Sequence, residues 1–137
     1  MVKENNMAPA NEEEILEAEQ AEQVVGSDGG LLEELLDGVY THTFAKPVLY
    51  DGKTYEKLTF DFDSLTGGDS LDVESELMAR NRPVIVRNID GEYLIRMAAK
   101  ACTERGADNK RVIGHDIFRL MSAKDYGKIT NIAKRFF

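Results

Sequence analysis

The sequence predicts an α+β domain in which a β-hairpin precedes a small helical bundle. Two observations predict this class. Apolar residues alternate with polar ones on both sides of Asp51-Gly52, which is the pattern of two half-buried strands joined by a tight turn. After Gly67-Gly68 the apolar residues recur instead with the period of a helix, and this continues to Phe137.

Residues 1–38 are predicted to form a flexible acidic leader outside this domain. They hold one basic and eleven acidic side chains, so their net charge is −10, and they contain no aromatic residue. Such a segment lacks the apolar material for a core and is typical of a partly disordered or loosely helical chain. Residues 31–36 combine leucines and glutamates at helical spacing, which favours docking of this short turn on the domain or on a partner. The folded domain is then residues 39–137.

The hairpin is predicted to begin near Thr41, where threonines and aromatic residues alternate. Pro47 places the first strand at an edge of the sheet or beside a bulge, because proline has no N–H to donate. Asp51-Gly52 is a turn signal, since both central residues of a two-residue hairpin turn need a positive φ. On the return strand Tyr55 is out of phase with the apolar row, which indicates a bulge near residues 56–57. That row consists of Leu58, Phe60 and Phe62.

The first helix is predicted over residues 69–79. Asp69 or Ser70 can cap its start, and Arg82-Pro83 prevents its continuation, since a residue before proline avoids helical backbone angles. Its apolar side consists of Leu71, Leu77 and Met78. Residues 84–86 are all β-branched, so they indicate a short third strand between this helix and the next.

Three further helices are predicted after that strand. The first covers residues 90–105 and is ended by Gly106. Its buried face consists of Leu94, Met97, Ala98 and Ala101, at i, i+3, i+4 and i+7. A short helix then carries Ile117, Leu120 and Met121. The last helix begins with a capping-box-like sequence at Ser122. Its stripe consists of Ile129, Ile132, Ala133 and Phe136.

Two segments resemble ligand loops but lack necessary residues. Residues 66–70 have the glycines of a phosphate loop without its lysine or a third glycine, so an ordinary turn with a helix cap explains them better. A calcium loop that started at Asp61 would need glycine where Thr66 stands and glutamate where Asp72 stands. We therefore expect no cofactor and no calcium site.

Catalytic and membrane-bound functions are equally poorly supported. His42, His115 and Cys102 are the only histidines and the only cysteine, and their spacing suits neither a zinc site nor a Cys–His nucleophile. One cysteine points to a reducing interior, and no apolar run approaches the roughly 18 residues of a membrane helix. We expect a protein that is not an enzyme and does not bind a membrane.

The basic end of the chain is the strongest charge feature of the domain. Residues 80–137 hold thirteen basic and six acidic side chains, a net charge of +7 within a chain of net charge −8. This could be a phosphate-binding surface, but no recognition helix or cluster of stacking aromatics accompanies it. The pattern favours a solvated face, or one that attracts the acidic leader, over nucleic-acid binding.

The order of these motifs resembles a known family. Residues 44–60, with the letters FAKPVLYDGKTYEKLTF, resemble the opening of the small tail assembly chaperones of long-tailed phages and prophages. Residues 66–69, residues 92–101 and the closing Phe136-Phe137 agree with that family as well. The resemblance covers about residues 40–137. The acidic leader and a charged insertion at residues 80–82 depart from it.

The resemblance implies a function in tail assembly. Proteins of this family bind the long tape-measure protein and help bring tail-tube subunits to it, in the cytoplasm of the bacterial host, and they are not expected in the mature virion. They need no catalytic group. A nucleic-acid-binding regulatory module and a structural tail or head–tail component remain the alternatives, and self-association into a homo-oligomer stays open.

The partner surface is predicted on the last helix. Phe136 continues the stripe and is expected to plug the domain's own core, whereas Phe137 is turned by about 100° and is expected to contact the tape-measure protein or another copy. Tyr126 lies three positions before Ile129 on a similar face. The predicted partner-binding residues are Tyr126, Ile129, Ile132, Phe136 and Phe137.

Overall fold

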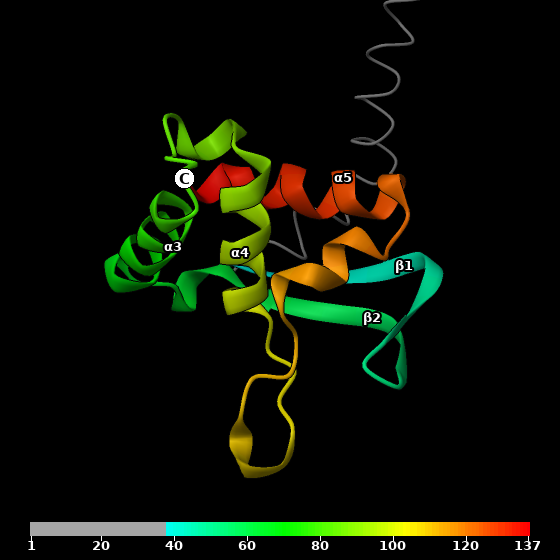
Figure 1. Cartoon of the computed structure of the whole chain (residues 1–137). Helices are drawn as coiled ribbons and strands as arrows, with labels where there is room; N and C mark the ends of the chain where they lie inside the picture. Colours follow the sequence, from blue (N-terminus) through cyan, green and yellow to red (C-terminus); the bar gives the residue numbers. More distant parts are fainter. Residues whose placement is uncertain (1–37) are drawn as a thin grey trace, which may run out of the picture. The chain divides into compact units, whose positions relative to one another are not determined.

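The computed structural model describes residues 38–137, and its α+β class confirms the predicted one. An antiparallel hairpin of β1 (Val39–Tyr50) and β2 (Lys53–Asp61) precedes three helices, as Figure 1 shows. These are α3 (Gly67–Ala79), α4 (Gly91–Ala101) and α5 (Ala123–Ala133). The connections contain the 3₁₀ turns Phe62–Ser64, Arg87–Ile89, Ala107–Asn109 and His115–Arg119, and Lys134–Phe136 follows α5. Apart from Gly38, the predicted leader lies outside the described residues.

The hairpin turn has the predicted geometry, but its bulge lies on the other strand. Asp51 and Gly52 have φ values of 52° and 81°, as a two-residue turn of this type requires. The pairing is regular from Val39 to Thr43 and resumes at Val48, so residues 44–47 of β1 face only residue 56 of β2. The bulge predicted on the return strand is therefore wrong, whereas the prediction that Pro47 places the first strand beside a bulge is confirmed. Pro47 cannot donate, and the Ala45 N–H bonds the Asp125 carboxylate instead of β2.

Helix α4 is the centre of the core. Its predicted face of Leu94, Met97, Ala98 and Ala101 is buried, and so are most of its other side chains. The helix ends at Ala101, four residues earlier than predicted. Cys102 adopts an extended conformation and pairs with Phe60, and the Thr103 N–H donates to the Thr59 carbonyl at 2.9 Å. Pairing with the sheet thus ends the helix before Gly106 can.

Helix α3 begins earlier than predicted and buries fewer residues. Thr66 is its N-cap, and Asp69 closes a capping box from the first turn, where the sequence favoured Asp69 or Ser70 as the cap itself. Val73 and Leu77 are buried one turn apart. Leu71 and Met78 are 64% and 61% exposed, so their predicted burial is wrong; they point away from the narrow face that meets α4.

The third strand predicted at residues 84–86 is absent; the sheet of the described residues has two strands. The segment is a loop with a bend at Ile85, which is 83% exposed. A 3₁₀ turn, Arg87–Ile89, joins it to α4. The β-propensity of these β-branched residues is therefore not sufficient to form a strand.

The last helix follows the prediction up to its final turn. Ser122 caps it and accepts from the Asp125 N–H at 3.1 Å, and Ile129, Ile132 and Ala133 are buried. The α-helix ends at Ala133, and a 3₁₀ turn continues to Phe136. The short helix predicted before it is the 3₁₀ turn His115–Arg119, which buries Ile117 but leaves Leu120 exposed.

A buried polar chain ties β1 to the start of α5. His42 bonds Tyr40 through Nδ1 at 2.8 Å and Asp125 through Nε2 at 2.8 Å, and His42 and Asp125 are 2% and 1% exposed. Ala45 N–H and the Ser122 hydroxyl also donate to the Asp125 carboxylate. Burial would raise the pKa of Asp125, but the bonds from Ala45, His42 and Ser122 outweigh it and lower that pKa.

The lowered pKa of Asp125 predicts how stability depends on pH. Above the ordinary carboxyl pKa of 3.8 the ionised group stabilises the fold, and this contribution is lost as the pH falls through the lower folded value. Asp125→Asn should lower the free energy of unfolding by about 2 kcal/mol near neutral pH, because bonds to a buried charge are replaced by neutral ones. Urea denaturation across the acidic range should show the gap to wild type closing. Asp108→Asn, an exposed control, should show no gap, and a gap of constant size for Asp125→Asn would contradict the assignment.

Candidate functional site

The structure separates the five predicted partner residues. Ile129 and Ile132 are 0% and 4% exposed, so their side chains contact the domain's own core. Tyr126, Phe136 and Phe137 are half-buried. Phe136 and Phe137 line one cavity and Tyr126 another, so they do not form one continuous face.

The two terminal phenylalanines contact different elements of the domain. The Phe136 ring stacks on Phe62 with ring centres 4.9 Å apart. The Phe137 and Tyr93 rings form an edge-to-face pair, with ring centres 5.4 Å apart and an interplanar angle of 86°. The two rings thus diverge, as predicted for neighbours on a helical turn. Phe136 packs on the buried Phe62 of the domain's own core, as expected, but it is only half-buried, because the 3₁₀ turn carries it to the rim of the core.

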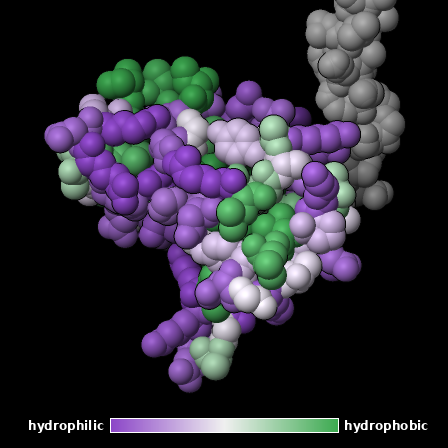
Figure 2. All heavy atoms as spheres, turned by 45° about the vertical axis from the view of Figure 1, so that its right-hand side comes forward, coloured by the Kyte–Doolittle hydropathy of each residue, from purple (hydrophilic) through white to green (hydrophobic). Residues whose placement is uncertain are grey.

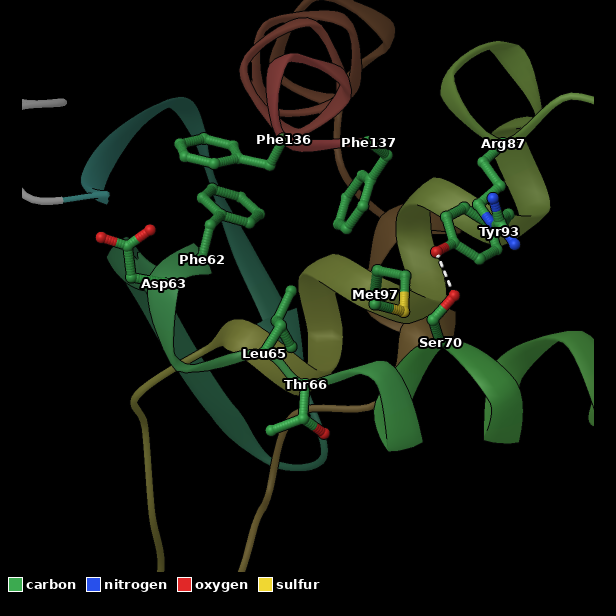
Figure 3. Close-up of a pocket in the computed structure, with 10 residues that line it drawn as sticks. All are labelled: Phe62, Asp63, Leu65, Thr66, Ser70, Arg87, Tyr93, Met97, Phe136 and Phe137. Carbon is green, nitrogen blue, oxygen red and sulfur yellow. Dashed lines mark hydrogen bonds between the residues drawn. The ribbon is translucent and has the colours of Figure 1, made fainter.

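These rings border a cavity of about 410 Å³. Figure 3 shows Phe62 after β2, Tyr93 and Met97 on α4, and both terminal rings around it. The Ser70 and Tyr93 hydroxyls are hydrogen-bonded at 2.7 Å on one side. The full lining is Phe62, Asp63, Leu65, Thr66, Ser70, Arg87, Tyr93, Met97, Phe136 and Phe137.

The cavity suits an apolar side chain better than a reaction. Four aromatic rings, a leucine and a methionine provide its walls, and charges stand only at Asp63 and Arg87, which Figure 3 places on opposite sides. Arg87 is held by Glu74, so its guanidinium is already paired. The lining contains no carboxylate–histidine pair and no thiol that could act as acid, base or nucleophile. What the site can do is bind an apolar group of a partner.

The candidate nucleophile and ligands of the sequence lie elsewhere and apart. Cys102 is 1% exposed, and burial raises the pKa of its thiol, so it is inert. His42 is enclosed in the chain with Asp125, and His115 lies near Glu76 at 3.9 Å. Within residues 38–137 no three His, Cys, Asp or Glu side chains gather as metal ligands would.

Tyr126 lines a second cavity, of about 460 Å³, at the start of α4. A Cβ atom on Gly91 would lie 2.7 Å from the Tyr126 hydroxyl oxygen, so a side chain there would require the Tyr126 ring to shift. Glu92 bonds Arg119 at 2.6 Å; burial would raise the pKa of Glu92, but Arg96 and Arg119 outweigh it and lower that pKa. The lining is Arg82, Gly91, Glu92, Ile95, Phe118, Arg119 and Tyr126. Its charges are already paired, so the cavity shows no free group for a ligand.

Five of the thirteen cations of the basic end are paired with carboxylates of the described residues. Arg96 is 5% exposed and bonds both Glu76 and Glu92, which joins α3 to α4. Further pairs are Arg82–Asp90, Arg87–Glu74, Lys100–Asp69 and Arg119–Glu92. Cations held by carboxylates release fewer counterions on binding a phosphate backbone, so these pairs count against the nucleic-acid interpretation.

Several residues that are candidates for binding were not identified from the sequence. Phe62 was assigned to the hairpin, and Tyr93 falls outside the helical stripe that the spacing picked out, yet both line the cavity. Ile85 and Ile89 are the most exposed large apolar residues of the domain, at 83% and 73%. The signal that could have found Ile85 is Pro83 before it, because a proline next to an isolated apolar run argues against a buried strand.

Comparison with family models, with curated proteins and with solved structures found no match to this chain. None of the helices in residues 38–137 is long and apolar enough to cross a membrane. The function therefore has to be argued from the cavity, the surface and the sequence motifs.

The burial of Phe136 predicts a moderate effect on stability. Phe136→Ala should lower the free energy of unfolding by about 2 kcal/mol, because a half-buried ring loses less than the 3–5 kcal/mol of a fully buried one. Phe60→Ala, at a residue that is 0% exposed, should lose the full amount. Chemical denaturation of both variants measures this. Equal losses would mean that the terminal turn belongs to the core.

Proposed function

We propose that this protein is a tail assembly chaperone of a long-tailed phage or prophage. It binds the tape-measure protein and helps recruit tail-tube subunits while the tail is built, in the host cytoplasm. The observation that carries the proposal is the motif of residues 44–60, which resembles the opening of that family and here forms the hairpin up to Phe60. The matching residues 92–101 coincide with the buried helix α4.

The cavity supports the same proposal on physical grounds. A chaperone for a long helical protein has to cover an apolar face of its partner and stay soluble. A cavity bordered by four aromatic rings can accept such side chains, and the ion pairs across α3 and α4 keep the surrounding surface charged. Phe137 is a candidate contact because it is aromatic, only half-buried, and follows the 3₁₀ turn Lys134–Phe136.

Co-expression with the tape-measure protein of the same phage or prophage tests the proposal. We expect wild type to keep that protein in the soluble fraction and to co-purify with it. Phe137→Ala should weaken the co-purification several-fold, because it removes a half-buried aromatic anchor from the cavity. Leu120→Ala changes an exposed residue outside the cavity and serves as the matched control.

Two results would contradict the proposal. One is a wild-type protein that neither co-purifies with the tape-measure protein nor changes its solubility. The other is its presence in purified virions at a stoichiometric level, which indicates a structural tail component. Circular dichroism of each variant checks that lost binding is not lost folding.

A further inference from the structure

Three branched apolar residues are displayed on the segment between α3 and α4. Ile85, Val86 and Ile89 are 83%, 47% and 73% exposed. Figure 2 shows a hydrophobic cluster at the top of the view, at the height where Figure 1 draws this segment. Single exposed apolar residues are ordinary, but several gathered on one short segment mark an interaction site. We call Ile85, Val86 and Ile89 the apolar cap.

The apolar cap is held in place by its neighbours. The Arg82 N–H donates to the Leu77 carbonyl at 2.9 Å, which fixes the start of the segment on α3. The Arg82 side chain bonds Asp90 at 2.9 Å, so the two ends of the segment are clamped together. Arg87, in its middle, bonds Glu74 of α3. The exposure of the cap therefore belongs to a defined surface, which lowers the entropy cost of binding.

Two cations, unpaired among the described residues, lie on the turn beside the apolar cap. Its 3₁₀ turn, Arg87–Ile89, packs beside the terminal turn Lys134–Phe136. Residues 80–89 and 134–137 contain no acidic side chain. Arg82 and Arg87 are paired, but Lys134 and Arg135 are exposed and form no ion pair with the described residues. The surface thus combines an apolar centre with a rim that carries unneutralised cations.

We propose that the apolar cap, with Lys134 and Arg135, is a docking surface for an amphipathic helix whose polar flanks are acidic. Three apolar side chains within five residues offer the width of one helical stripe, and the cationic rim complements carboxylates beside that stripe. A second copy of the same face would bring the same cations against one another, which disfavours self-pairing. That the helix belongs to the tape-measure protein rests on the proposed function.

The cap and the aromatic cavity adjoin each other at the terminal turn. Arg87 belongs to the segment of the cap and also lines the cavity, and Phe136 belongs to the turn beside which the cap packs. One partner helix can therefore lay its stripe on the cap while a neighbouring apolar side chain enters the cavity. This continuity makes a helix a better occupant than an extended strand, since the described segment 81–90 offers no strand edge to pair with.

The test uses the full-length protein and two designed helical peptides that share one leucine stripe. One peptide has glutamates beside the stripe and the other has lysines. Fluorescence anisotropy should show that the acidic peptide binds about tenfold or more tightly than the basic one. The Ile85→Ser/Ile89→Ser variant should bind the acidic peptide about tenfold more weakly. Lys134→Glu/Arg135→Glu should weaken it by a similar factor and flatten its salt dependence.

Matched controls separate the surface from general effects. Leu49→Ser/Leu71→Ser removes two equally exposed leucines elsewhere, and Lys124→Glu/Lys128→Glu reverses two exposed cations on α5. Both should bind the acidic peptide like wild type. Thermal unfolding of each variant checks the fold. The preference of the wild-type protein for the acidic peptide over the basic one is measured without any variant.

The outcomes distinguish this inference from the proposed function. Equal binding of both peptides, or unchanged binding by the Ile85→Ser/Ile89→Ser variant, would overturn the docking surface even if the tape-measure protein co-purifies. Dimerisation that requires Ile85 and Ile89, without affinity for the peptides, would overturn it in favour of a second copy. Peptide binding as expected, without co-purification, would support the surface and reject the tape-measure protein as its partner.

Discussion

The burial of α4 is the constraint on which the rest of the domain depends. Nearly every side chain from Tyr93 to Ala101 is removed from water, so the helix has to be covered from several directions. The hairpin, α3, α5 and the 3₁₀ turns around it supply that cover. A charged residue is tolerated on such a helix only if its partners come with it, and Arg96 meets this condition through Glu76 and Glu92.

The cover is incomplete where the candidate site lies. Tyr93 and Met97 reach the cavity, and the terminal rings of Phe136 and Phe137 close only part of it. The same aromatic contacts therefore contribute to stability, and the half-buried rings of Phe136 and Phe137 leave apolar surface for a partner, whereas Phe62, Tyr93 and Met97 are buried. Such a boundary between core and binding site needs no reactive group, which is consistent with a function in protein association.

Polar interactions decide which charges remain available on the surface. Acidic side chains of α3 and of the start of α4 pair with five of the thirteen cations of the basic end, which are Arg82, Arg87, Arg96, Lys100 and Arg119. Lys134 and Arg135 escape this pairing and flank the apolar cap. Pairing thus removes five cations from the surface charge, and the two beside the apolar cap are among the eight cations of residues 80–137 that form no ion pair with the described residues.

The sequence by itself determined the elements that local patterns encode. The hairpin turn follows from the backbone demands of Asp51-Gly52, and the buried face of α4 follows from its apolar spacing. Only the tertiary structure decided the end of α4, which Cys102 sets by pairing with Phe60, and the exposure of Ile85. It also brought Tyr93 to Phe137 to form the site. The physical reason is that periodicity tells which face of an element can be buried, whereas the neighbour that covers it depends on contacts between residues far apart in the chain.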